Sequence, residues 1–305
     1  KYLVIGNPIE HSLSPLLHSF WIKKHSINAI YEKQLVEKND IEKIFNDMKE
    51  NKIQGINVTV PFKKIVIPFL DQLSDTAKKT QSVNTIFKRQ NKLVGDNTDV
   101  YGFSEAIKLT NFDLTNKKTL ILGAGGVVPS LILALKNMGS LQITLSNRTK
   151  EKAEDLKKSF PFLKVISWGE TIKSDLIINA TSVGIKRNEE IQLDYSKLQG
   201  RLFYDVIYNP AKTKFLENAK KTGKKIENGK SMFIYQAMKA FEIWHGIKPE
   251  VNQDGKPLVG ILIPYLSMLP SEPFFVSFLA YSNCSSQFCG GLSGSSPTSL
   301  KASLL

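Results

Sequence analysis

Short apolar runs alternate along the chain with longer segments in which apolar residues recur every three or four positions. The short runs predict buried strands, and the longer spacing predicts amphipathic helices. Because strands and helices alternate, the pattern predicts βα units and a mainly parallel sheet. The fold class we expect is therefore α/β.

The apolar runs locate the elements along the chain. Strands are expected over residues 2–6, 31–36, 55–60, 82–88, 92–95, 119–122, 141–146, 176–179 and 202–205. Helices are expected over residues 40–49, 63–70, 101–109, 129–138, 150–160 and 231–244. One more helix begins at Ser14, with Ser14 as N-cap and Pro15 in the first helical position. Its expected apolar face consists of Leu16, Leu17, Phe20 and Trp21. Residues 89–91 lie between two strands and predict a hairpin turn.

The length of 305 residues is sufficient for two domains with separate cores. We expect one domain over residues 1–100, a second over 101–230, and a helix over 231–251 that returns to the first. Residues 252–305 form a tail of different character, with four charged residues and a Ser/Gly-rich stretch at 290–296. Prolines interrupt its apolar runs, so no membrane span of about 20 residues is expected. An added docking segment is one interpretation of the tail, and a tail foreign to the domain is the other.

The formal net charge of +13 raises the question of a nucleic-acid partner. The excess is mostly lysine, since the chain has four arginines, and the lysines are dispersed. Dispersed lysines are typical of solvated helix faces, whereas base and phosphate recognition favours arginine. We therefore expect no nucleic acid as partner. A diffuse positive field would still attract anionic substrates and phosphorylated cofactors.

Cysteines and histidines are few. Both cysteines, Cys284 and Cys289, lie in the tail, which leaves the rest of the chain without a disulfide or a thiol nucleophile. The four histidines form no metal-binding spacing, so no metal is expected. His11 and His18 are interpreted as a loop residue and a helix-packing residue. No secretory signal opens the sequence, and a reducing cytoplasm fits best.

Two polar clusters follow apolar runs in the first half of the chain. Pro61 stops the run 55–60, and Lys63 follows it directly. The second cluster, residues 95–99, ends in Asp99. Strand ends are where α/β proteins place their chemistry. A lysine and a carboxylate ahead of a nucleotide-binding turn indicate a dehydrogenase with a proton-shuttling pair, Lys63 and Asp99.

A glycine-rich turn lies between the strand 119–122 and the helix 129–138. Gly123, Ala124, Gly125 and Gly126 fit a dinucleotide-binding fingerprint, in which backbone N–H groups face the pyrophosphate at a helix N-terminus. Such a short motif is not specific, and an ordinary tight turn is the alternative.

The end of the next strand carries no acidic residue for the ribose hydroxyls of NAD. It has Asn147, Arg148 and Thr149 instead, with Lys152 one turn into the following helix. Cationic, hydroxyl and amide donors suit the 2′-phosphate of NADP, so NADP is favoured over NAD. The alternative is a surface arginine beside a threonine that caps the helix.

Nine short motifs in chain order resemble those of one enzyme family. They cover residues 6–15, 57–63, 83–85, 95–99, 123–126, 147–149, 179–184, 205–210 and 235–237. The pattern resembles the shikimate dehydrogenase family over roughly residues 2–250, and the tail has no counterpart in it. The resemblance implies two domains, an α/β substrate domain followed by a Rossmann-like NADP-binding domain, with a cleft between them.

The resemblance also implies a reaction, the reversible NADPH-dependent reduction of 3-dehydroshikimate to shikimate. The implied catalytic pair is Lys63 and Asp99, in which Lys63 stabilises and protonates the substrate oxygen. The implied substrate-binding residues are Ser12, Ser14, Thr59, Asn84, Tyr208 and Gln236. The implied cofactor-binding residues are Gly123, Ala124, Gly125, Gly126, Asn147, Arg148, Thr149, Lys152, Thr181, Ser182 and Val183.

Two further readings of the resemblance remain open. One is a quinate/shikimate dehydrogenase of broader specificity, and the other is a ligand sensor that keeps the fold without the reaction. Ser12 and Ser14 favour shikimate, because altered residues there would suit other ligands. The partner expected is a small molecule, and the chain is expected to be a monomer or a homodimer.

Overall fold

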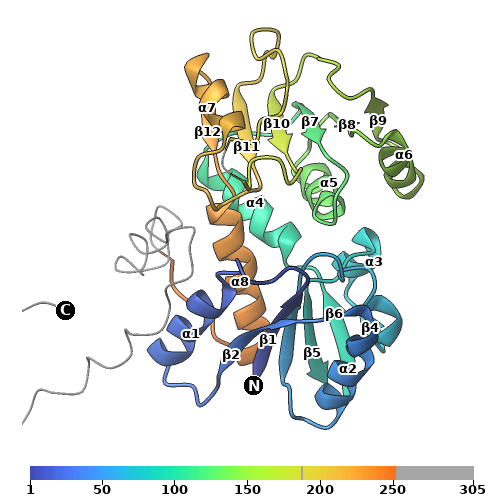
Figure 1. Ribbon diagram of the computed structural model, residues 1–305, viewed down its shortest axis with the longest axis vertical. Helices are drawn as coiled ribbons and strands as arrows, with labels where there is room; N and C mark the ends of the chain where they lie inside the picture. The colour runs from blue at the N-terminus through green and yellow to red at the C-terminus, as the bar shows by residue number, and fades with distance from the viewer. Residues whose placement is uncertain (187, 252–305) are drawn as a thin grey trace, which may run out of the picture. The chain divides into compact units, whose positions relative to one another are not determined.

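The computed structural model describes residues 1–186 and 188–251. These residues contain two six-stranded sheets flanked by helices (Figure 1). The tail and its two cysteines lie outside the described residues. No helix of the described part is long and apolar enough to cross a membrane.

The first sheet has the strand order β2-β1-β3-β5-β6-β4. Its strands are β1 (Tyr2–Gly6), β2 (Tyr31–Leu35), β3 (Gly55–Val58), β4 (Gln72–Leu73), β5 (Thr85–Arg89) and β6 (Lys92–Asp96). Its helices are α1 (Ser14–Lys24), the 3₁₀ helix η1 (Lys38–Asp40), α2 (Ile41–Lys49), the 3₁₀ helix η2 (Ile67–Phe69) and α3 (Asp75–Thr80). β5 is antiparallel to both β3 and β6, whereas the other three strand pairs are parallel, so the sheet is mainly parallel, as expected. The expected hairpin reverses the chain between β5 and β6, and Gln90 and Asn91 both take positive φ there.

The second sheet has the order β12-β11-β10-β7-β8-β9, and all its strand pairs are parallel, as expected. Its strands are β7 (Lys118–Leu122), β8 (Gln142–Ser146), β9 (Lys164–Ile166), β10 (Leu176–Asn179), β11 (Leu202–Asp205) and β12 (Lys225–Glu227). Its helices are α5 (Val128–Asn137), α6 (Lys150–Ser159) and α7 (Lys214–Lys221). The chain runs outward from β7 through β8 to β9 and then returns to β10 on the other side of β7. The loops after β7 and β10 therefore meet at a topological switch point, where open α/β sheets bind ligands.

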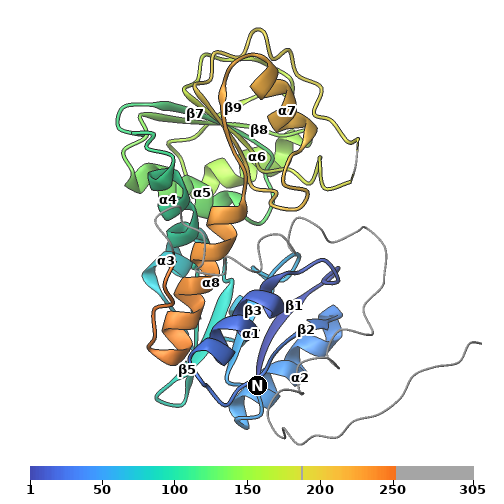
Figure 2. The ribbon, with the colours of Figure 1, turned by 90° about the vertical axis from the view of Figure 1, so that its left-hand side faces the viewer.

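Two further helices, α4 (Asp99–Leu109) and α8 (Lys230–His245), lie side by side (Figures 1 and 2). They approach closely at Gly102, where an added Cβ would lie 2.7 Å from the backbone oxygen of Met232. The other end of α8 packs on the first sheet through an aromatic and aliphatic cluster that includes Tyr2, Trp21 and Phe241. α8 thus returns to the first sheet, while the expected domain boundaries stay a prediction.

Several sequence expectations near the site are wrong in detail. Residues 63–70 do not form a helix but turns followed by η2, because Pro68 cannot donate the hydrogen bond that a helix interior needs. Ser14 is the first residue of α1, and Leu13 is its N-cap, with no side chain capping the helix. Leu16, expected on the apolar face, is exposed, and His18 is buried in its place.

Apart from the 3₁₀ helices, five short elements were not expected from the sequence. They are β4, α3, β9, α7 and β12, each eight residues long or less. The edge strands among them have little continuous apolar sequence, because much of their surface faces water. Pattern-based reading is weakest for such elements.

Candidate active site

Lys63 and Asp99 meet in a largely buried ion pair. The Lys63 Nζ atom lies 2.6 Å from Asp99 Oδ2, and the two side chains are 12% and 8% exposed. Lys63 lies in the turn after β3, and Asp99 is the first residue of α4 after β6. The two strand ends lie at one edge of the first sheet, which brings together residues 36 positions apart.

Asn84 holds the second oxygen of Asp99. Its Nδ2 atom donates to Asp99 Oδ1 at 2.9 Å and to the hydroxyl of Thr98 at 3.0 Å. The Asn84 Oδ1 atom accepts the Thr98 backbone N–H at 2.7 Å, which fixes the orientation of the amide. Gln236 of α8 brings its Oε1 atom to 3.5 Å from the same amide. The structure therefore brings four of the expected site residues into one network: Lys63, Asp99, Asn84 and Gln236.

Thr59, Ser12 and Ser14 follow the ends of neighbouring strands. β1 pairs in parallel with β3, and Thr59 donates its backbone N–H to Ile5 at 2.9 Å. Gly6 allows this approach, since a Cβ there would lie 2.5 Å from the Thr59 methyl group. The Ser12 hydroxyl accepts the backbone N–H of Ser14 at 3.4 Å, at the start of α1. These hydroxyls thus belong to the edge of the sheet that carries Lys63.

Tyr31 and Asn57 were missed by the sequence reasoning. The Tyr31 hydroxyl donates to Asn57 Oδ1 at 2.6 Å, and Asn57 Nδ2 donates to the Asn84 carbonyl at 3.1 Å. Burial raises the pKa of Tyr31 well above its usual value, which a hydrogen bond from Ser14 opposes. These contacts connect Ser14 to the Asn84 network. Asn57 is a polar residue inside an otherwise apolar strand, and that was the available signal.

Tyr208 follows β11 and packs against α8. Its ring stacks on Phe233 with the centroids 4.5 Å apart. Phe233 also accepts a hydrogen bond from Gln236 at its backbone carbonyl, at 2.8 Å. Burial raises the pKa of Tyr208, and a backbone hydrogen bond from Leu13 opposes that rise. Tyr208 is thus packed against the helix that carries Gln236.

The glycine turn lies at the switch point of the second sheet. Gly123 has a φ of +109°, and an added Cβ would lie 2.8 Å from the Ala180 carbonyl oxygen. Around Gly126 no heavy atom lies within 4 Å of such a Cβ, and Gly125 and Gly126 are both exposed. No side chain caps α5, which begins at Val128. An exposed glycine turn ahead of an uncapped helix fits the diphosphate of a dinucleotide.

The end of β8 presents exposed polar groups. The Asn147 amide donates to the Thr149 carbonyl at 2.6 Å, which holds the turn before α6. Thr149 is the N-cap of α6, but its side chain makes no cap hydrogen bond. Arg148 and Lys152 are exposed. Two cations beside the Thr149 hydroxyl fit a phosphate group. The alternative of a surface arginine beside a capping threonine stays open, because Thr149 occupies the N-cap position of α6 without a side-chain cap bond.

The loop after β10 is held by Asn179. Its Oδ1 atom accepts from the Thr181 backbone N–H at 3.0 Å and from the Thr181 hydroxyl at 2.7 Å. The Thr181 hydroxyl in turn accepts the backbone N–H of Val183 at 3.1 Å. Ser182, between them, is exposed. The three expected cofactor residues of this loop thus form one hydrogen-bonded turn beside Gly123.

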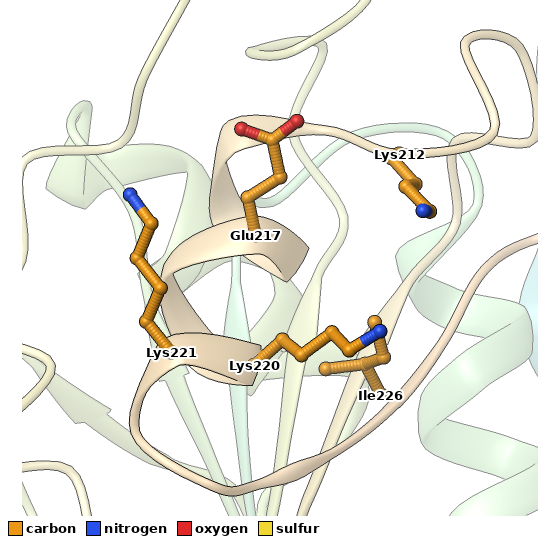
Figure 3. Close-up of a pocket in the computed structure, with 5 residues that line it drawn as sticks. All are labelled: Lys212, Glu217, Lys220, Lys221 and Ile226. Atoms are coloured by element: carbon orange, nitrogen blue, oxygen red, sulfur yellow. The ribbon is translucent and has the colours of Figure 1, made fainter.

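A basic hollow lies elsewhere on the second sheet, beside α7 and β12 (Figure 3). It is lined by Lys212, Glu217, Lys220, Lys221 and Ile226. The lining contains none of the expected site residues. In residues 1–186 and 188–251, no group of three or more His, Cys, Asp or Glu side chains could hold a metal ion.

Three family models match the chain in order. The model of the shikimate dehydrogenase substrate binding domain matches residues 4–86. The shikimate / quinate 5-dehydrogenase model matches residues 105–207, and the model of the shikimate 5′-dehydrogenase C-terminal domain matches residues 229–253. The first match covers Lys63 and Asn84, and the second covers the glycine turn and the Arg148 region.

Individual relatives agree with the family models. The shikimate dehydrogenase (NADP(+)) of Pelagibacter ubique is 58% identical over 254 residues, which are 83% of this chain and 96% of the relative. The crystal structure of the Aquifex aeolicus shikimate dehydrogenase superposes with a TM-score of 0.76 at 39% identity, covering 83% of this chain and 94% of that one. The Thermus thermophilus enzyme, solved in complex with NADP(H) and shikimate, gives 0.76 at 30% identity and covers 83% and 96%. The two-domain α/β fold is thereby confirmed, and the chain belongs to the shikimate dehydrogenase family.

Proposed function

We propose that this protein catalyses the reversible, NADPH-dependent reduction of 3-dehydroshikimate to shikimate, with Lys63 and Asp99 as its acid–base pair. The observation that carries the proposal is the 2.6 Å ion pair between Lys63 Nζ and Asp99 Oδ2 at the sheet edge. The names of the relatives support the reaction and the cofactor.

NADPH would supply the hydride to the carbonyl carbon of the substrate. Negative charge then develops on the carbonyl oxygen, and the Lys63 ammonium group neutralises it and transfers a proton to it. The Lys63 Nζ atom has three donors, so its bond to Asp99 leaves others for that oxygen. Asp99 holds the ammonium group in place and is itself held by Asn84 at its other oxygen.

We assign the substrate carboxylate to Ser12 and Ser14 at the start of α1, where hydroxyl donors and the helix dipole favour an anion. Thr59, Asn84 and Gln236 offer neutral donors and acceptors to the ring hydroxyls. Tyr208 would border both the substrate and the nicotinamide. The glycine turn would hold the diphosphate, Arg148 and Lys152 the 2′-phosphate, and Thr181 to Val183 the nicotinamide side.

The test compares two adjacent lysines. Lys63 is mostly buried against Asp99, whereas Lys64 is exposed. Lys63→Met should lower kcat for 3-dehydroshikimate reduction by about 10²–10⁴-fold, which is the usual contribution of a general acid. NADPH binding, followed by fluorescence, should persist and would show that the cofactor domain is intact. Lys64→Met is the matched control and should keep wild-type turnover. A Lys63→Met enzyme with near-normal kcat would refute the assignment.

Specificity and assembly require their own measurements. The serines at positions 12 and 14 favour shikimate over quinate, and the cations after β8 favour NADP over NAD. Steady-state rates with both substrates and both cofactors test this preference directly. Comparable rates with quinate would favour the broader-specificity alternative, and no NADPH oxidation at all would favour the ligand sensor. A monomer or homodimer in the cytoplasm stays our expectation.

A further inference from the structure

We propose that Asp205 is a positioning residue that fastens together the loops after β10 and β11 and thereby sets the place of the nicotinamide. The proposal rests on the proposed function, because those loops carry the residues assigned to the nicotinamide side. Asp205 itself lies beneath the loops as the last residue of β11 and has no exposed surface. It therefore acts through other residues.

The Asp205 carboxylate accepts hydrogen bonds from both loops. Its Oδ2 atom accepts from Asn179 Nδ2 at 3.1 Å, and Asn179 is the residue that holds the turn of Thr181 and Val183. Its Oδ1 atom accepts the backbone N–H of Ile207 at 2.9 Å, directly before Tyr208. One carboxylate thus connects the proposed nicotinamide loop with the segment that presents Tyr208.

Thr213 provides the third bond and closes the second loop. Its hydroxyl donates to Asp205 Oδ2 at 2.6 Å and accepts the backbone N–H of Leu216, which caps α7. Thr213 also lies beside the first loop, since a Cβ added at Gly184 would be 3.0 Å from the Thr213 methyl group. The loop from Val206 to Lys212 is therefore fixed at both ends by the same side chain.

The charge of Asp205 is costly where it lies. Burial raises its pKa to about 6, and the bonds from Thr213, Ile207 and Asn179 lower it only in part. All three donors are neutral. Burial, Glu190 and Asp205 raise the pKa of the half-buried Tyr195, and burial, Glu227 and Asp205 raise the pKa of the buried Tyr204. An apolar residue at this position would leave three donors without their acceptor, so the carboxylate serves its three directed bonds.

The Asp205→Asn substitution distinguishes a positioning role of Asp205 from a general effect on the stability of the fold. The new amide group would face the Asn179 amide across the 3.1 Å contact, donor against donor, whereas the Ile207 bond can persist. We expect about tenfold weaker NADPH binding and a kcat lowered about ten- to a hundredfold, as for a misplaced reactant. Binding of adenosine 2′,5′-bisphosphate, which has no nicotinamide, should stay within about twofold of wild type, because Arg148 and the glycine turn are untouched.

Two further variants show whether a change in NADPH binding results from a folding defect. Thr213→Val removes the hydroxyl at nearly constant shape and should shift NADPH binding in the same direction, and Thr213→Ser should restore it. Asp194→Asn is the control, because Asp194 is a carboxylate of the same sheet region that bonds only Ser196 and Lys197 among the described residues. It should change neither ligand's affinity.

If Asp205→Asn and Thr213→Val weaken the binding of NADPH and of adenosine 2′,5′-bisphosphate equally, the proposal is overturned and Asp205 has a structural role. Unchanged binding of both, with unchanged kcat, would overturn it as well. Failure of the proposed function looks different. Wild-type protein would then bind NADPH without oxidising it in the presence of 3-dehydroshikimate, and the comparison of the two ligands would still decide the role of Asp205.

Discussion

Replacing His18 with phenylalanine should remove a large part of the acid sensitivity of this protein. His18 is 1% exposed, and its ring stacks on Tyr31 with the centroids 4.2 Å apart and the planes 1° from parallel. Trp21 and Trp244 lie at 5.7 and 5.4 Å. Neither ring nitrogen has a hydrogen-bond partner in the described part of the chain. The imidazole is therefore held neutral inside an aromatic cluster.

The size of the effect on the free energy of unfolding follows from the pKa of His18. Burial lowers this pKa to about 3, and the nearby His245 contributes in the same direction. In the unfolded chain a histidine titrates near pH 6.5. Between these values the unfolded state binds the extra proton, so the free energy of unfolding falls as the pH falls. The slope is about 1.4 kcal/mol per pH unit, and at pH 5 the loss reaches about 2 kcal/mol.

Urea unfolding followed by tryptophan fluorescence at pH 7, 6 and 5 measures the effect. The difference in free energy of unfolding between His18→Phe and wild type should grow by about 2 kcal/mol from pH 7 to pH 5. Asp205 acts with the opposite sign, because a raised carboxyl pKa stabilises the fold as the pH falls from about 6 toward 4. Both proteins carry Asp205, so its effect cancels in the difference. His11→Asn, at an exposed position, is the control. Equal pH slopes for His18→Phe and wild type would refute the reasoning.

Two further predictions concern the cofactor and the packing of α8. Arg148→Ala should raise the KM for NADPH about tenfold or more and leave the KM for NADH nearly unchanged, since only NADPH has the 2′-phosphate that a charge-assisted bond would recognise. Steady-state rates with both cofactors measure this difference, and equal effects on the two KM values would contradict the prediction. Gly102→Ala should destabilise the fold by about 1–3 kcal/mol although alanine favours helices, because its Cβ would lie 2.7 Å from the Met232 carbonyl oxygen. Urea midpoints test this, and Gly126→Ala, where a Cβ meets nothing within 4 Å, should keep wild-type stability.

The sequence was sufficient for the elements that have a strong pattern. β1, β10 and β11 have the expected bounds, and most helices begin or end within two residues of the expected position. Strand ends were equally informative for the site, since Lys63 and Asp99 were expected to pair and lie 2.6 Å apart. The local sequence pattern gave wrong expectations where a contact in the tertiary structure determines the role of a side chain. Ser14 bonds with Tyr31 instead of capping α1, and the order of strands that brings those two residues together is not encoded locally.

The Asp205 network shows most clearly what the sequence leaves out. Asn179 and Asp205 are each the last residue of a strand whose bounds were expected correctly, and each is polar after an apolar run. They lie opposite each other only because β10 and β11 are adjacent and in parallel register, with Asn179 paired to Asp205. That adjacency results from the packing of the whole sheet, in which β10 lies between β7 and β11. A polar residue at the end of an expected strand is therefore a candidate site residue, but its partner is known only once the neighbouring strand is known. For this chain the neighbour is β11, and its carboxylate connects the loop after β10, at the switch point of the sheet, with the loop after β11.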